Sequence, residues 1–161
     1  MKERKFEFSF EVYEGIDDLN ADDQQLLVEA RHVTGQAYAP YSNFHVGAAA
    51  KLGNGKIVTG TNQENASYPI GICAERVLLS AVSSLYPGIP IETMAISYQG
   101  KNIKSDHPIS PCGMCRQALL EFEGRTDKLI RLILAGMKGK IYVIRSASQL
   151  LPLAFRSEEL G

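Results

Sequence analysis

Apolar and polar residues alternate along several stretches of the chain, and we predict these stretches to be strands. The N-terminal run FEFSFEV places Phe6, Phe8, Phe10 and Val12 on one face, as in a strand with a repeat of two residues. The segments FHVGAAAKL and KIVTGTN flank a Gly53-Asn54-Gly55 turn, and this arrangement predicts a hairpin. The other predicted strands are IETMAISY (91–98), LIRLILAG (129–136) and IYVIR (141–145).

Helical patterns lie between the predicted strands. One helix is expected from about Asp22 to Ala37, with acidic residues in its first turn. The segment GICAERVLLSAV (71–82) predicts a buried helix that begins near Cys73, and SPCGMCRQALLEF (110–122) predicts a loop that enters a helix near Cys112. SASQLLPLAF predicts a short last helix that Pro152 stops. Strands that alternate with helices indicate a layered α/β fold.

Length and charge narrow the class of protein. The chain has 161 residues, which favours one domain over 1–161, with 1–21 as a strand-like N-terminal extension. A net charge of -1 argues against a nucleic-acid partner. No apolar run approaches the length of a membrane span, and Glu7 and Glu11 interrupt the only stretch that could be a signal peptide. We therefore expect a cytoplasmic protein with reduced thiols and no membrane partner.

The chain has three cysteines, Cys73, Cys112 and Cys115, and this odd number argues against a complete set of disulfides. The Cys112-x-x-Cys115 pair alone is compatible with a redox pair, half of a zinc site, or two small buried residues. None of the three histidines lies at an obvious ligand spacing from these cysteines.

The cysteines are more informative together. Cys73 and Cys112 each lie at the predicted start of a helix, where the helix dipole favours a thiolate. Three thiolates leave the fourth tetrahedral position of zinc open, as in catalytic sites. Glu75 follows the first of these ligands by two residues. It could therefore act as a general acid and base beside the metal.

Four motifs, in this order, resemble the small zinc-dependent cytidine deaminases of pyrimidine salvage. They are YAPYSNFHVGAA, TNQENASYPIGICAER, PCGMCRQ and LLPLAF, between about Asp22 and Phe155. The resemblance implies a three-layer α/β/α sandwich around a mixed sheet of about five strands. It also implies a homotetramer with active sites shared between subunits. The implied reaction is the hydrolytic deamination of cytidine and deoxycytidine to uridine and deoxyuridine plus ammonia.

The same resemblance implies roles for individual residues. Cys73, Cys112 and Cys115 would hold one Zn²⁺ per chain, and Glu75 would transfer protons. From the charge of such a site, and not from the resemblance, we expect Arg76 to donate hydrogen bonds to the cysteine sulfurs, which would offset the negative charge of three thiolates. The substrate-binding residues implied by the resemblance are Phe44, Asn62, Glu64, Ala66, Tyr68, Ala74 and Phe155.

Other functions remain compatible with these motifs. The chain could deaminate a related nucleoside antibiotic or a base in nucleic acid. It could also be a zinc-binding module without catalysis, and a fourth protein ligand at the metal would favour that reading.

Overall fold

The computed structural model describes residues 1–161 as six strands and three α-helices. The sheet has the order β1-β6-β5-β4-β2-β3, and it is mixed because β4 and β5 run parallel while every other neighbouring pair is antiparallel. The strands are β1 (Glu11–Tyr13), β2 (Phe44–Leu52), β3 (Ile57–Thr61), β4 (Ile91–Gly100), β5 (Arg131–Ala135) and β6 (Ile141–Ile144). The helices are α1 (Ala21–Val33), α2 (Ala74–Leu85) and α3 (Gly113–Thr126).

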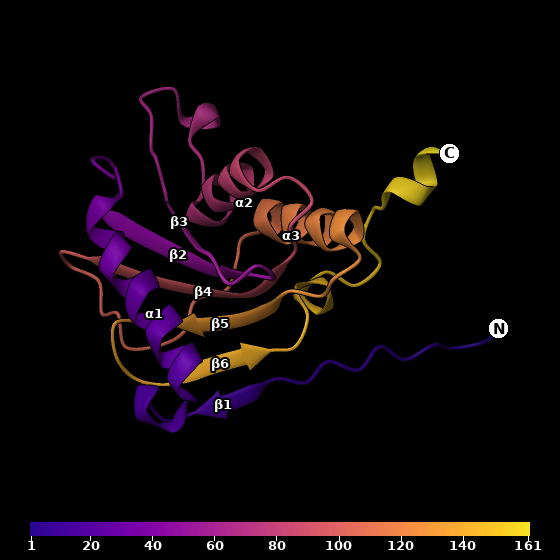
Figure 1. Cartoon of the computed structure of the whole chain (residues 1–161), viewed down its shortest axis with the longest axis horizontal. Helices are drawn as coiled ribbons and strands as arrows, with labels where there is room; N and C mark the ends of the chain where they lie inside the picture. The colour runs from indigo at the N-terminus through magenta and orange to yellow at the C-terminus, as the bar shows by residue number, and fades with distance from the viewer.

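The helices cover both faces of the sheet, as Figure 1 shows. Alternate residues of β2 belong to different cores: Ala48 and Ala50 pack beneath α2 and α3, whereas Ala49 packs beneath α1. This alternation follows from the strand geometry, because successive side chains point to opposite faces. The predicted three-layer α/β/α sandwich is confirmed, with six strands in place of about five. None of the helices is long and apolar enough to cross a membrane.

The N-terminal strand is shorter than predicted. Only Glu11–Tyr13 pair with β6, while residues 1–10 extend away from the body of the molecule (Figure 1). β6 ends at Ile144, which the register places opposite Phe10, so Phe6 and Phe8 lie beyond the end of the neighbouring strand. An alternating pattern alone therefore did not determine the length of the strand.

Two predicted helices also differ at their ends. The first ends at Val33 and continues as a 3₁₀ turn over Thr34–Gln36, so the α-helix does not reach Ala37. The last is a 3₁₀ helix over Ala147–Leu150, and the chain then turns at Pro152 and Leu153, the latter with a φ of 55°. The hairpin is confirmed, with Gly55 in its turn at a φ of 79°.

The first turn of α2 lies in close contact with Gly60 of β3. A Cβ atom on Gly60 would lie 2.5 Å from the carbonyl oxygen of Ala74 and 2.6 Å from the amide nitrogen of Leu78. Since real Cβ atoms do not approach backbone atoms this closely, any larger residue would push the first turn of α2 away from β3. The glycine thus allows the residues at the start of α2 to lie directly on the sheet.

We expect Gly60→Ala to destabilise the fold by about 1–3 kcal/mol, the usual effect of overpacking. Gly124→Ala in α3 is the matched control, because a Cβ atom there meets no other atom within 4 Å. That control should be neutral or stabilise the protein by roughly 0.5–1 kcal/mol through helix propensity. Urea denaturation of both variants checks the prediction, which is wrong if the two midpoints shift together.

Candidate metal centre and its cavity

Three cysteine side chains converge above one face of the sheet. The Sγ atoms of Cys73 and Cys112 lie 3.8 Å apart, those of Cys112 and Cys115 lie 3.5 Å apart, and all three lie within 4.8 Å of one another. Cys115 is buried, Cys73 is half-buried and Cys112 is exposed. The cluster therefore has one side in the core and one side open.

Two helix N-termini place these thiols. Cys73 is the residue before α2 and Cys112 is the residue before α3, and both have extended backbone conformations. Their carbonyl oxygens accept the first helical hydrogen bonds, from the amides of Val77 and Arg116, each at 3.0 Å. Both thiols thus lie at the positive end of a helix dipole, which stabilises a thiolate.

Backbone contacts fix the two loops that lead to these helices. The segment before Cys73 is held by reciprocal backbone hydrogen bonds between Gln63 and Ile72, at 2.9 and 3.0 Å. The segment before Cys112 is held by the Arg116 guanidinium, which donates to the carbonyl oxygens of Pro111 at 2.9 Å and Leu150 at 3.0 Å. The cysteines are therefore positioned by the chain itself.

The thiols differ in how readily they lose a proton. A hydrogen bond from Cys115 lowers the pKa of the Cys73 thiol to about 6, and the nearby Arg76 charge acts in the same direction. Cys115 donates that hydrogen bond and is buried, and both effects raise the pKa of its own thiol. The lowered pKa favours the thiolate form of Cys73, which is the form that binds a cation.

The cluster fits zinc. Zn–S bonds of about 2.3 Å in a tetrahedron place sulfur atoms about 3.8 Å apart, close to the 3.5 and 3.8 Å seen here. No histidine, aspartate or glutamate joins the three cysteines as a fourth ligand. A site with three protein ligands leaves one coordination position for another molecule, and this distinguishes catalytic from structural zinc sites.

Glu75 lies in the first turn of α2, beside this cluster. Its side chain is only 5% exposed. Burial raises the pKa of the Glu75 carboxyl, although hydrogen bonds from its own backbone amide and from Cys115 oppose the shift. A buried carboxyl with a raised pKa holds a proton more readily than an ordinary glutamate, which suits a group that must act as both general acid and general base.

A cavity of about 410 Å³ opens onto the metal centre. Five of the predicted site residues line it together with two of the cysteines, and these seven are Phe44, Asn62, Glu64, Cys73, Ala74, Glu75 and Cys112. Four lining residues were not predicted from the sequence: Ser42, Val46, Ile109 and Ser110. Ser42 and Val46 lie two residues on either side of Phe44, and Ile109 and Ser110 directly precede the Pro-Cys-x-x-Cys motif. Their closeness to these motifs is the one feature of the sequence that could have identified them as lining residues.

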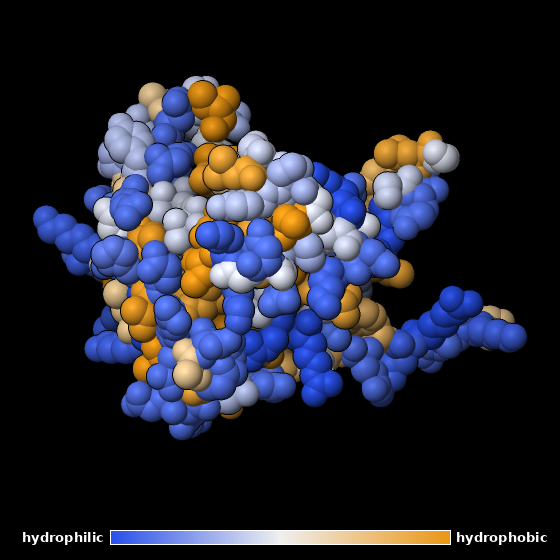
Figure 2. Space-filling view, in the orientation of Figure 1, coloured by the Kyte–Doolittle hydropathy of each residue, from blue (hydrophilic) through white to orange (hydrophobic).

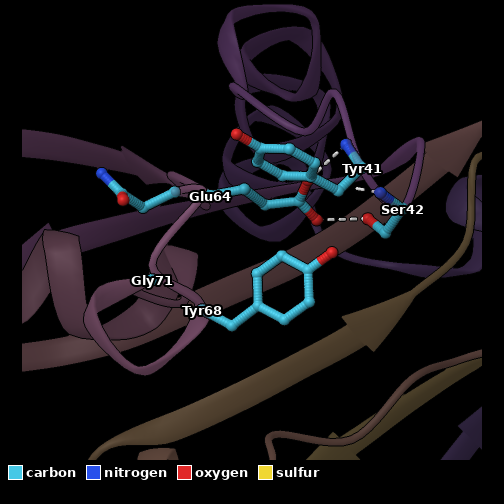
Figure 3. Close-up of a pocket in the computed structure, with 6 residues that line it drawn as sticks. Tyr41, Ser42, Glu64, Tyr68 and Gly71 are labelled. Atoms are coloured by element: carbon cyan, nitrogen blue, oxygen red, sulfur yellow. Dashed lines mark hydrogen bonds between the residues drawn. The ribbon is translucent and has the colours of Figure 1, made fainter.

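Asn62 and Glu64 already make hydrogen bonds within the protein. The Asn62 amide donates to the Phe44 carbonyl oxygen at 2.8 Å and accepts from the Val46 amide at 2.7 Å. Glu64 accepts hydrogen bonds from the Ser42 hydroxyl and from the backbone amides of Tyr41, at 2.9 Å, and Ser42, at 3.3 Å (Figure 3). Desolvation raises the pKa of the Glu64 carboxyl, but these hydrogen bonds outweigh it and lower the pKa.

Tyr68 and Ala66 lie outside the main cavity, on the loop before α2, where both are exposed. Tyr68 and Tyr41 both line a second cavity of about 380 Å³, and their rings pack edge to face with centroids 5.7 Å apart (Figure 3). Ser42 and Glu64 line both cavities, so the two adjoin. Figure 2 shows hydrophobic surface at the tip of this loop, where Ile70 is exposed.

Arg76 and Phe155 lie on the outer side of α2 and α3. Arg76 makes no hydrogen bond to a cysteine sulfur, and it lines a surface groove together with Met114 and Phe155. Phe155 is 59% exposed, and its carbonyl oxygen accepts a hydrogen bond from the Gln117 amide at 3.0 Å. The Phe155 ring therefore does not enter the cavity of its own chain.

Tyr98 supports the cavity wall from behind and was not predicted. Its ring stacks on Phe44, with centroids 5.2 Å apart. Its hydroxyl lies 3.2 Å from the nearer ring nitrogen of His107 and donates to the Lys104 carbonyl oxygen at 3.2 Å. Tyr98 thus links Phe44 to the loop that leads to Cys112. Its place in a strand pattern gave no sign of this contact.

Comparisons with known proteins agree with this geometry. Residues 20–131 match the family described as the cytidine and deoxycytidylate deaminase zinc-binding region. The cytidine deaminase of Halalkalibacterium halodurans is 37% identical over 140 residues, which cover 87% of this chain and 98% of that protein. The one from Sporosarcina psychrophila is 36% identical over 87% of this chain and 96% of that protein.

Solved structures give the same result. The crystal structure of cytidine deaminase from Burkholderia pseudomallei superposes with a TM-score of 0.70 at 38% identity, covering 85% of this chain and 100% of that chain. The crystal structure of cytidine deaminase from Mycobacterium tuberculosis has a TM-score of 0.64 at 34% identity, covering 85% and 99%. The likeness thus extends over the full length of the solved chains.

We expect Cys112→Ala to lose the metal and to lower the melting temperature, because ligand binding is coupled to folding. The exposure of Cys112 keeps the direct packing loss small. Met114→Ala is the control, since Met114 is a 63% exposed residue of the same turn and should keep one zinc per chain. Metal analysis of both purified variants gives the answer, and stoichiometric zinc in Cys112→Ala would exclude this site.

Proposed function

Because the chain belongs to the cytidine and deoxycytidylate deaminase family, we propose that it hydrolyses the 4-amino group of cytidine and deoxycytidine. The products are uridine or deoxyuridine and ammonia. The observation that carries the proposal is the position of Glu75. Its buried carboxyl lines a cavity of nucleoside size next to three thiols that lack a fourth protein ligand. A non-catalytic zinc module has no need of this arrangement.

Cys73, Cys112 and Cys115 would hold one zinc ion per chain. Zinc bound there supplies Lewis-acid activation of a water molecule at neutral pH. Glu75 performs the proton transfers: its carboxylate accepts one proton from the attacking water and delivers it to ring N3 of the base, then accepts the remaining proton of the same oxygen and passes it to the leaving amino nitrogen, which departs as ammonia. Its raised pKa suits both directions, because the group must bind the proton and then release it.

The cavity wall would bind the nucleoside through separate contacts to base and sugar. Phe44 packs on the pyrimidine ring, and Ala74 lies against its edge. Glu64 accepts hydrogen bonds from the ribose hydroxyls, a role that its lowered pKa favours because the carboxylate stays ionised. Asn62 contributes its remaining amide hydrogen and lone pair, since one of each is already used by β2.

Arg76 would balance the charge of the metal centre. Three thiolates on Zn²⁺ leave a formal charge of -1, which opposes the activation of water. The Arg76 guanidinium already lowers the pKa of Cys73 through space. Because no hydrogen bond joins it to sulfur here, the proposed contact requires a change of side-chain rotamer.

We also propose that the active unit is a homotetramer in the cytoplasm, formed from single-domain subunits. Tyr68 and Phe155 are both exposed aromatic residues. Tyr68 lines the second cavity, and Phe155 lines the surface groove beside Arg76. Their exposure suits contacts with a neighbouring subunit, where Phe155 would complete the base-binding pocket and Ala66 and Tyr68 its rim. The proposed partners are therefore the nucleoside and further copies of the chain, without nucleic acid or membrane.

The first test of this function is Glu75→Gln. The variant should keep zinc and bind nucleoside but lose turnover by a factor of about 10² to 10⁴, the usual contribution of general acid–base catalysis. Glu92→Gln, on an exposed position of β4, is the control and should keep full activity. Deamination of cytidine at a normal rate by Glu75→Gln would overturn the assignment.

The substrate class is tested by assaying the unmodified protein on cytosine and on a single-stranded oligonucleotide. Both should react far more slowly than cytidine.

A second test concerns Phe155. Burial of one aromatic ring stabilises an interface by roughly 1.5–3 kcal/mol, so Phe155→Ala should raise the KM for cytidine and loosen the oligomer while zinc content stays normal. Subunits of Phe155→Ala mixed with subunits of Glu75→Gln should regain part of the activity, because some sites then combine both intact residues from different chains. If the subunits exchange without any gain, Phe155 acts within its own chain.

A further inference from the structure

Residues 1–10 form an exposed N-terminal arm that lies outside the part of the chain matched by the family, which begins at residue 20. The arm protrudes from the body of the molecule (Figures 1 and 2). Its three phenylalanines are 42–57% exposed. Three large apolar side chains on one face of an extended segment are unusual on a surface that faces only water.

The arm continues an open edge of the sheet. It leads into β1, which has β6 as its only neighbouring strand. Val12 pairs with Tyr142 in register, and Phe10 contacts the Tyr142 ring with centroids 4.8 Å apart. Phe8 in turn stacks on Phe10 at 5.6 Å. The phenylalanine face is thus continuous with the sheet, while the outer edge of β1 has no strand beside it, and such edges readily pair with another chain.

The charges along this segment are ordered. Over residues 2–14, Lys2, Arg4 and Lys5 make the start basic despite Glu3, whereas the end carries only the acidic Glu7, Glu11 and Glu14. Two copies that run antiparallel would therefore bring the basic start of each against the acidic end of the other. An antiparallel pair of identical segments is also what a two-fold axis generates.

We propose that two copies of the chain pair as antiparallel strands through residues 2–14, with Phe8 opposite the partner's Phe8. Phe6 then faces the partner's Phe10, and Lys5 faces the partner's Glu11. Directly opposed aromatic pairs and opposite charges both stabilise antiparallel strands. Lys2 faces the partner's Glu14. By symmetry, an opposite-charge pair therefore lies at each end of the paired strands.

The neighbouring two-fold registers are disfavoured by their charges. If the axis passed through Glu7, Glu7 would face its own copy and Glu3 would face the partner's Glu11. If it passed through Ser9, Glu7 would face the partner's Glu11. Like charges directly opposite one another destabilise a strand pair, whereas the proposed register contains none. The pairing would join the two six-stranded sheets into one.

Existing contacts of these side chains do not prevent the pairing. The Glu11 carboxylate accepts an exposed hydrogen bond from the Tyr13 hydroxyl at 2.7 Å, which leaves its other oxygen free for a partner. Glu11 also lies 4.0 Å from Arg145, Glu14 lies 3.2 Å from Lys140, and Lys5 lies 2.8 Å from Glu7. All three are exposed ion pairs, and such pairs contribute little because water competes for both charges. They can therefore be exchanged for contacts with the partner.

Single cysteines introduced into the arm of the zinc-loaded full-length protein test the register. Phe8→Cys should form a disulfide-linked dimer under mild oxidation, because directly opposed positions are within reach of a disulfide. Glu7→Cys and Ser9→Cys are matched controls, whose identical positions would be about 7–8 Å apart diagonally. Each variant should retain deaminase activity, since no residue of the arm lines the cavity. Equal linking at all three positions, or none at Phe8→Cys, would overturn the proposal.

The proposed pairing of Lys5 with the partner's Glu11 is tested independently by reversing these charges in the Phe8→Cys variant. Lys5→Glu or Glu11→Lys should each slow the initial rate of disulfide linking about fivefold, because each substitution replaces two attractive pairs by two repulsive ones. The double variant restores the pairs with reversed sign and should recover the original rate. A double variant that links as slowly as the single variants would show that these residues do not face each other.

Discussion

The close approach of α2 to β3 is the constraint on which the site depends. Without a side chain at Gly60, the first turn of α2 can touch the backbone of the sheet. This contact fixes the height of Cys73 and Glu75 above β3, and therefore their position relative to α3. A metal centre assembled from two helix N-termini needs this accuracy, because a change of even a fraction of an ångström between ligands weakens coordination.

The two helix N-termini also stabilise negative charge on the thiols. Each carries a partial positive charge at its first turn, and both are directed at the thiols. The buried Cys115 and the exposed Cys112 give the cluster an inner and an outer side. Glu75 lies on the buried side, where its carboxyl is shielded from water and its pKa is raised. Thiolates and a protonatable carboxyl can thus coexist within one turn of helix.

Much of this arrangement could be predicted from the sequence, because local patterns encode it. The hairpin around Gly55, the starts of α2 and α3, and the three cysteines follow from turn residues, periodicity and spacing. The start of β1 could not be predicted, since it depends on where the antiparallel strand β6 stops. The stacking of Tyr98 on Phe44 was missed for a similar reason, because it joins β2 and β4 across the sheet. The rotamer of Arg76 also depends on neighbours that the spacing does not reveal.

The first turns of α3 bind two parts of the chain that are otherwise separate. Arg116 holds the loop before Cys112 and the Leu150 carbonyl, and Gln117 holds the carbonyl of Phe155. The order of the C-terminal tail and the geometry of one metal ligand therefore share the same anchor. Couplings between binding events are reciprocal, so if ordering of the tail through this anchor strengthens metal binding, metal binding orders the tail to the same degree.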